Sequence, residues 1–324
     1  MNQERPSITD IFSAMTANQT MAVAKEEKNP TKLWKEFWIE NEVCCLFADA
    51  NVGKSILAVQ IGNYISENIL KDNETVLYYD FELSKKQFEL RYTDKESKKP
   101  FNFSDRFIRV ELDSDVVRDY CEYSKKPFDE VIIQAIEANI SKYNSRVLIV
   151  DNLSWLVNMK DTATTAGKLM KNLCNIKKKY NVSILVLSHT PKRNLGSPLT
   201  QNSLSGSKKL TNFFDAMFAV GMSIKDSSLR YLKQIKVRTG EFKYGEDHVA
   251  MCKIEKDGPF LGFKMLGFST EKEELKAPSG KNKPSVKSKR NTTKKKRGKR
   301  FKSELTNFQI DMVEKMVEDA FSSL

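Results

Sequence analysis

From residue 43 to residue 215, short apolar runs alternate with longer stretches in which apolar residues recur at helical spacing. The short runs are rich in β-branched and aromatic residues, as is typical of strands buried in a parallel sheet that helices cover on both faces. The predicted strands cover residues 43–47, 75–79, 106–111, 146–150 and 182–187. The predicted helices cover residues 55–69, 84–92, 128–143 and 164–180. The alternation predicts an α/β fold with a mainly parallel sheet flanked by helices.

Beyond residue 215 the pattern contains strands without intervening helices. These strands are predicted at residues 216–222, 229–237, 249–255 and 261–265. Strands joined by short connections pair as antiparallel neighbours, because a parallel crossover needs a longer link. We therefore expect the sheet to finish in antiparallel C-terminal strands.

The two ends of the chain differ in composition from this region. Residues 1–42 are polar and lack a sustained period apart from a late aromatic cluster, and they are interpreted as an N-terminal arm. The α/β domain covers residues 43–270. Residues 271–303 are predicted to form a disordered basic linker, because they hold too few apolar residues for a core. Residues 304–324 place apolar residues at helical spacing, which predicts a C-terminal amphipathic helix that docks on a partner or another subunit.

Length and composition narrow the class of protein. A chain of 324 residues, 40% of them hydrophobic, can build one large domain with its own core. It has no apolar run near the roughly 18 to 20 residues that span a bilayer, and its polar start lacks the apolar region of a signal peptide. We expect a soluble, cytoplasmic protein without a membrane partner. The five cysteines form no Cys-x-x-Cys pair and only two histidines accompany them, so no structural zinc site is predicted.

The net charge of +12 is concentrated in one segment. Residues 276–303 hold thirteen basic residues and no acidic ones, and +12 minus +13 leaves about −1 for the rest of the chain. The folded body is therefore expected to be nearly neutral, with a basic tail that contacts phosphates without reading bases.

Residues 48–55 read ADANVGKS and stand between a predicted strand and a predicted helix. They match the P-loop pattern G-x-x-x-x-G-K-[ST], with Ala48 in place of the first glycine. Successive N–H groups and a helix N-terminus create a positive concavity for phosphate in such a loop. Gly53 allows close approach of the backbone, Lys54 brings a charge to the β and γ phosphates, and Ser55 can ligate Mg²⁺. The predicted ATP-binding residues are Ala48, Asp49, Ala50, Asn51, Val52, Gly53, Lys54, Ser55 and Ile56.

Acidic and polar side chains follow three other predicted strands. Asp151 ends the apolar run of residues 147–150, at the carboxyl edge where open α/β sheets bind ligands, and is predicted to support Mg²⁺ together with Ser55. Asp80 and Glu82 follow the strand after the P-loop helix, and either carboxylate could polarise the attacking water. His189 ends a later strand, where it could sense the γ-phosphate.

In this order the motifs resemble those of RecA-like P-loop ATPases, and among them the hexameric replicative helicases of the DnaB and plasmid RepA kinds. The resemblance covers about residues 40–265 and implies a RecA-like P-loop fold. Residues 80–84 (DFELS), with Gln87 and Arg91, are similar to the strand-end motif whose glutamate is the catalytic base, and this selects Glu82 over Asp80.

Two further motifs belong to the same resemblance. Residues 186–193 (VLSHTPKR) are similar to the motif that reports the γ-phosphate, with His189 where the family often has glutamine. Lys236 and Arg238 resemble the Lys-x-Arg finger that reaches the nucleotide of a neighbouring subunit. An arginine supplied in this way accelerates hydrolysis by about 10³ to 10⁵. The resemblance implies a homo-oligomer, a hexameric ring in the helicases.

DNA, in single-stranded form, is the expected partner. A loop rich in Gly, Ser and Asn follows the strand that ends at His189 and could track the phosphate backbone. The basic tail is the second candidate, through salt-sensitive contacts with phosphate. The predicted DNA-binding residues are Lys192, Arg193, Lys208 and Lys209 in the loop and Lys294, Lys295, Lys296 and Arg297 in the tail.

These observations predict a magnesium-dependent ATPase that acts on DNA, first as a ring-forming helicase or translocase in plasmid or mobile-element replication. A second hypothesis is a recombination or repair ATPase, which would form filaments. A third is an ATP-switched module that binds DNA or loads a partner, through its C-terminal tail and final helix, without motor activity.

Overall fold

The computed structural model describes residues 12–153, 163–204 and 208–276. The chain divides into two compact units, Met1–Pro278 and Ser279–Leu324, and the second unit lies outside the described residues, as does the predicted terminal helix. Of the predicted linker, residues 277–303 lie outside the described part. Its first residues, Glu271–Glu274, instead form a short helix with Glu271 and Glu274 buried, so the folded region extends past residue 270. Among the described residues, no helix has the length and apolar character that crossing a bilayer requires.

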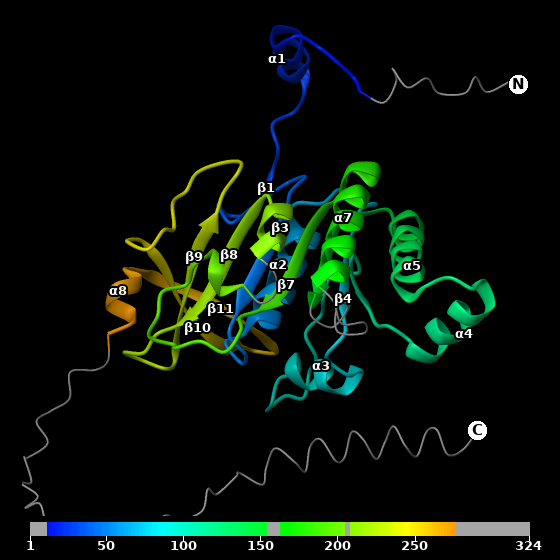
Figure 1. The fold of residues 1–324 in the computed structure, drawn as a ribbon. Coiled ribbons are helices and arrows are strands. Elements are labelled where there is room, and N and C mark those ends of the chain that lie inside the picture. The colour runs from blue at the N-terminus through cyan, green and yellow to red at the C-terminus, as the bar shows by residue number, and fades with distance from the viewer. Residues whose placement is uncertain (1–11, 154–162, 205–207, 277–324) are drawn as a thin grey trace, which may run out of the picture. The chain divides into compact units, whose positions relative to one another are not determined.

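A nine-stranded sheet with the order β11-β10-β9-β8-β3-β7-β6-β4-β5 forms the centre of the described fold (Figure 1). The strands from β8 to β5 in that order pair in parallel, and β9, β10 and β11 continue the sheet in antiparallel pairing. Their bounds are β3 (Val43–Ala48), β4 (Thr75–Asp80), β5 (Phe107–Val110), β6 (Ser145–Asp151), β7 (Ser183–His189), β8 (Ala216–Met222), β9 (Leu229–Lys236), β10 (Val249–Asp257) and β11 (Phe260–Ser269). The predicted α/β fold with antiparallel C-terminal strands is confirmed.

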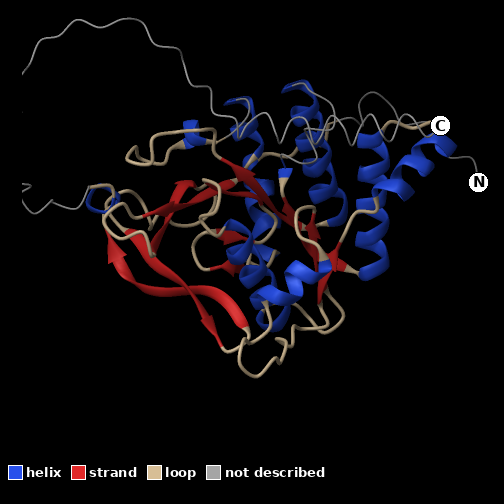
Figure 2. Cartoon of the chain, turned by 90° about the horizontal axis from the view of Figure 1, so that it is seen from below, coloured by secondary structure: helices blue, strands red, loops and turns tan. Residues whose placement is uncertain are grey.

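Helices lie on both sides of these strands (Figure 2). The helices of the described residues are α1 (Ala17–Glu26), α2 (Lys54–Asn68), α3 (Lys85–Arg91), α4 (Ser114–Ser124), α5 (Phe128–Tyr143), α7 (Ala163–Tyr180) and α8 (Glu271–Glu274), with the short 3₁₀ turns η2 (Gln201–Ser203) and η3 (Lys208–Phe213). Helix α1 projects away from the sheet (Figure 1). The long predicted helices appear within one or two residues of their expected bounds. Helix α4 was not predicted, because it carries no buried residue and so no sustained apolar face marks it in the sequence.

Alternate residues of each central strand face two separate hydrophobic cores, because side chains of a strand point to opposite faces in turn. In β3, Cys44 and Leu46 pack with α2, whereas Cys45 and Phe47 pack with α5 and α7. Every residue of β3 is buried. The continuous apolar runs therefore mark strands covered on both faces, as the sequence pattern predicted.

The end of the predicted arm belongs to the core. A hairpin of β1 (Lys32–Trp34) and β2 (Trp38–Ile39) buries Trp34, Phe37 and Trp38. The ring of Phe37 stacks on that of Tyr244, with centroids 4.8 Å apart. The aromatic cluster therefore packs in the hydrophobic core on the α2 side of the sheet. Helix α1, which precedes it, has no buried residue.

Candidate functional site

The loop between β3 and α2 has the backbone that its glycine permits. Gly53 adopts φ +105°, in the left-handed region that other residues avoid. A Cβ atom built on Gly53 would lie 2.4 Å from Cδ1 of Ile254 on β10, so a larger residue would also require that side chain to move. No side chain caps the N-terminus of α2. Its first N–H groups thus stay available to an anion, as the motif predicted.

Asp151 lies at the carboxyl end of β6, only 1% exposed. Its Oδ2 accepts a 2.7 Å hydrogen bond from the Tyr78 hydroxyl, while its Oδ1 is buried without a protein partner. Burial raises the pKa of Asp151, and the nearby Lys54 charge and Ser55 hydroxyl oppose this shift. A buried, orphaned carboxylate oxygen beside a serine hydroxyl offers the hard oxygen ligands that Mg²⁺ prefers. The residues present therefore fit the predicted metal.

Asp151 is not on a strand adjacent to the P-loop strand. Strand β7 lies between the P-loop strand β3 and β6, which ends in Asp151. The strand adjacent to the P-loop strand therefore ends in His189, which pairs in register with Ala48. Asp151 reaches the P-loop region from one strand farther away.

Glu82, Asn152 and His189 form a cluster at the same edge. The Asn152 amide donates to Glu82 Oε1 and lies 3.1 Å from Nε2 of His189, which is 3.6 Å from Oε1 of Glu82. The contact with His189 lowers the pKa of Glu82, and the positive charge of Lys54 acts in the same direction. The Glu82 side chain remains 42% exposed and is ionised at neutral pH, so it can accept a proton from water.

Asn152 was missed by the sequence analysis. The sequence feature that could have identified Asn152 is its position directly after Asp151, at the edge where the other polar side chains converge. It is 2% exposed, and its amide bridges the ends of β4 and β7.

Asp80 is engaged in a structural role. Its Oδ1 accepts from the backbone N–H groups of Glu82 and Leu83, and its Oδ2 forms a 2.9 Å ion pair with Arg109. These contacts shape the turn that presents Glu82. The geometry therefore favours Glu82 over Asp80 as the group that meets water.

Lys236 and Arg238 are not brought to this edge. Because β9 runs antiparallel to β8, Lys236 pairs with Met217 at the amino end of β8, opposite the P-loop. Arg238 forms an ion pair with Asp215 at 2.5 Å, while its side chain stays 59% exposed. The Lys236 ammonium donates to the Thr211 carbonyl at 3.0 Å. Neither cation can serve the nucleotide site of its own chain.

The predicted DNA-binding residues have different surroundings. Lys192 is exposed, whereas the Arg193 side chain is 12% exposed and is paired with Asp49. Lys208 and Lys209 begin η3, and their side chains lie outside the described part of the chain. The basic tail residues Lys294, Lys295, Lys296 and Arg297 also lie outside it.

Comparison with known proteins agrees with this geometry. A family model described as an AAA domain matches residues 12–194, which is more than half of the chain. The DNA repair protein RadA of Campylobacter jejuni is 24% identical over 208 residues. That match covers 62% of this chain but only 38% of RadA.

Proposed function

The chain belongs to the AAA domain family, and we propose from this premise that it is a magnesium-dependent ATPase that acts on DNA. One observation carries the ATPase proposal. Lys54, Ser55, Asp151 and Glu82 meet at one sheet edge beside an uncapped helix N-terminus, and Asp151 holds a buried oxygen without a protein partner.

Each residue has a distinct part in the proposed reaction. The N–H groups at the start of α2 and the Lys54 ammonium bind the triphosphate, since both are positive groups fixed before substrate arrives. Ser55 and Asp151 would hold Mg²⁺, which neutralises charge on the phosphates when bound. Asn152 and His189 orient Glu82, and Glu82 accepts a proton as water attacks the γ-phosphate.

Replacement of Glu82 by glutamine tests the base. Glu82→Gln keeps the size and an oxygen for the Asn152 amide but removes the proton acceptor. We expect kcat to fall about 10² to 10⁴-fold, the usual contribution of a general base, with ATP affinity nearly unchanged. Phosphate release measured at saturating ATP gives kcat, and titration with a fluorescent ATP analogue gives affinity.

Glu89→Gln is the matched control, because Glu89 is an exposed carboxylate on the helix that follows. It should hydrolyse ATP at the wild-type rate. Wild-type turnover by Glu82→Gln would remove Glu82 from the mechanism.

The DNA part of the proposal is supported by the similarity to a DNA repair protein and by the exposed Lys192 on the loop after β7. We propose that single-stranded DNA binds this loop, with Lys208 and Lys209, and the basic tail. As a helicase or translocase, the active form would be a homo-oligomeric ring in which Arg238 serves the adjoining subunit. The exposure of Arg238, on the sheet edge opposite its own P-loop, supports that arrangement.

Hydrolysis with and without single-stranded DNA locates the DNA contact. Three full-length proteins are compared. They are the wild type, a loop variant with glutamine in place of the loop lysines, and a tail variant with glutamine in place of the basic tail residues. We expect DNA to stimulate the wild type and expect the loop variant Lys192→Gln, Lys208→Gln, Lys209→Gln to lose that stimulation. Stimulation lost only when Lys294, Lys295, Lys296 and Arg297 are replaced would assign DNA to the tail. Absence of stimulation in the wild type would contradict the DNA proposal.

The similarity to RadA favours one alternative, an ATPase of DNA repair. The two functions differ in assembly and in activity. Rings in electron micrographs, with ATP-dependent unwinding of a forked duplex, would support the helicase. Filaments on single-stranded DNA without unwinding would support the repair ATPase.

A further inference from the structure

Arg193 binds a carboxylate of the P-loop instead of facing solvent. Its Nε lies 3.1 Å from both oxygens of Asp49, and Nη2 lies 2.9 Å from Oδ2. The two side chains are 12% and 14% exposed. The Thr190 hydroxyl donates to the same carboxylate. Asp49 is therefore the shared acceptor of two side chains from the segment that follows β7.

The same guanidinium shapes its own loop. Nη1 of Arg193 donates to the Ser197 carbonyl at 2.6 Å. The backbone of Thr190 donates to the Ala48 carbonyl at 3.2 Å. The start of this loop is thus joined to the P-loop by both backbone and side-chain contacts.

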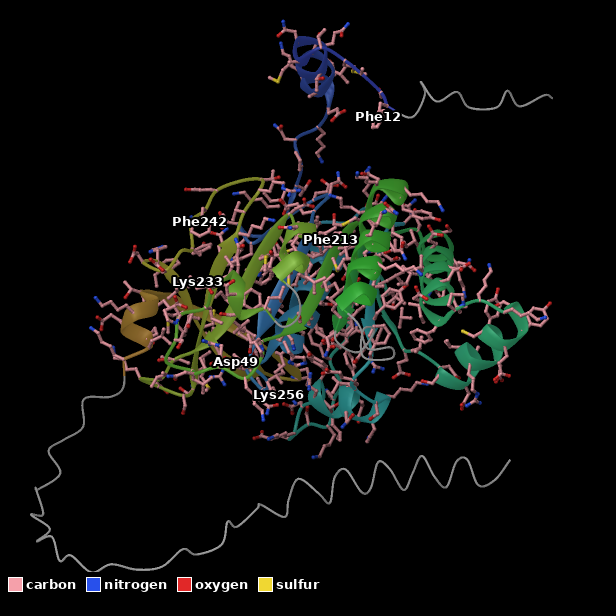
Figure 3. All side chains as sticks on the ribbon, viewed as in Figure 1. Phe12, Asp49, Phe213, Lys233, Phe242 and Lys256 are labelled. Carbon is pink, nitrogen blue, oxygen red and sulfur yellow. The ribbon has the colours of Figure 1, made fainter. Side chains whose placement is uncertain are left out.

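The far end of the loop is fixed to strand β9 and helix α8. The Leu199 N–H donates to Glu271 at 2.8 Å, and the Leu199 carbonyl accepts from Lys233 at 3.0 Å. Asp49 and Lys233, labelled in Figure 3, mark the two attachment points of residues 190–199. A loop held at both ends depends on the P-loop for the position of its first half.

The charge of Asp49 explains why this pair matters for the nucleotide. A carboxylate inside a loop that binds phosphates repels them, and the repulsion is strongest where burial limits screening by water. A bidentate guanidinium offsets that charge and holds the carboxylate in one orientation. Without Arg193, Asp49 would stand as an uncompensated, mostly buried anion beside the phosphate site.

We propose that Arg193 is a positioning residue of the nucleotide site, which neutralises Asp49 and fixes the loop after β7 to the P-loop. The inference rests on the proposed binding of ATP phosphates by residues 48–55. It replaces the expectation that Arg193 contacts DNA. Of the two neighbouring cations, Lys192 is exposed, whereas Arg193 is mostly buried.

Four full-length variants test this, with Mg²⁺ and a fluorescent ATP analogue as the probe. Arg193→Gln should weaken binding of the analogue about tenfold or more, because it leaves Asp49 unpaired. Adding Asp49→Asn to that variant should restore affinity to within about threefold of wild type, since the repelling charge is gone. Arg193→Lys keeps the charge but loses the bidentate contact, so its affinity should lie between those of Arg193→Gln and wild type. Lys71→Gln removes an exposed charge just beyond the far end of α2 and should not change affinity.

The outcomes separate this inference from the proposed function. A wild-type protein that binds no analogue overturns the proposed function and the inference together. Wild-type binding with no loss in Arg193→Gln, or a loss that Asp49→Asn does not restore, overturns the inference alone. Normal analogue affinity combined with weaker DNA binding in Arg193→Gln would return Arg193 to the DNA contacts. Arg193→Gln breaks a mostly buried ion pair and should lower the thermal midpoint, so affinity is measured well below the midpoint of each variant. If Arg193→Gln does not fold, the double variant with Asp49→Asn must still bind the analogue to within about threefold of wild type, and a tenfold loss there overturns the inference.

Discussion

Lys54→Ala should reduce ATP hydrolysis about 10² to 10³-fold, the loss typical when one preorganised electrostatic donor is removed from a reaction centre. Lys54 is 6% exposed, and its charge opposes the rise in the pKa of Asp151 that burial causes and helps to lower the pKa of Glu82. The ammonium therefore stands close to the two carboxylates and to the phosphate-binding backbone. Its removal takes away a positive charge where the negative charge of the substrate is concentrated. Steady-state phosphate release and titration with a fluorescent ATP analogue measure the effect.

The loss should not arise from unfolding. Removal of Lys54 leaves the buried Asp151 with less compensating charge, so the thermal midpoint should fall. Hydrolysis and affinity are therefore compared at a temperature well below the midpoint of the variant. Lys71→Ala, which removes an exposed lysine just beyond the same helix, is the control and should hydrolyse ATP normally. Equal hydrolysis by Lys54→Ala and wild type would refute the assignment of the P-loop.

Glu271→Ala should destabilise the fold by about 3 to 5 kcal/mol, the range for breaking a buried ion pair by removal of one partner. Glu271 and Lys233 have side chains only 2% and 7% exposed and are in direct contact. Glu271 also accepts hydrogen bonds from the Leu199 N–H and the Tyr231 hydroxyl. The substitution leaves the Lys233 ammonium buried, with the carboxylate of Glu246 3.9 Å away as its remaining ion-pair partner. Urea unfolding followed by circular dichroism measures the change.

Two further variants test whether the unpaired charge of Lys233, and not a change in helix α8, causes the loss of stability. Adding Lys233→Met to Glu271→Ala should recover part of the lost stability, because no unpaired charge then remains in the interior. Glu273→Ala removes an exposed carboxylate from the same short helix and should leave the unfolding midpoint unchanged. A double variant less stable than Glu271→Ala would show that the buried lysine does not cause the loss.

The sequence determined much of the fold because its signals are local. Runs such as residues 147–150 are apolar at every position, which a strand buried on both faces requires, and the strands predicted from them appear in the sheet. The P-loop was also recognisable, since Gly53, Lys54 and Ser55 are contiguous and their functions depend on neighbouring backbone. The strand-end positions of Asp151, Glu82 and His189 predicted one shared sheet edge, where the structure places them.

Only the tertiary structure decided which of the polar side chains form ion pairs within the protein and which remain available to a ligand. Pairing of Asp80 with Arg109 and of Asp49 with Arg193 joins residues far apart in the sequence, and no local pattern marks such pairs. The insertion of β7 between β3 and β6, which brings Asn152 between Glu82 and His189, likewise depends on strand order. Local patterns of polarity specify elements, whereas the partners of a charge are set by packing between elements distant along the chain. The same sequence could therefore suggest Arg193 as a DNA contact, although in the folded chain its guanidinium binds the P-loop.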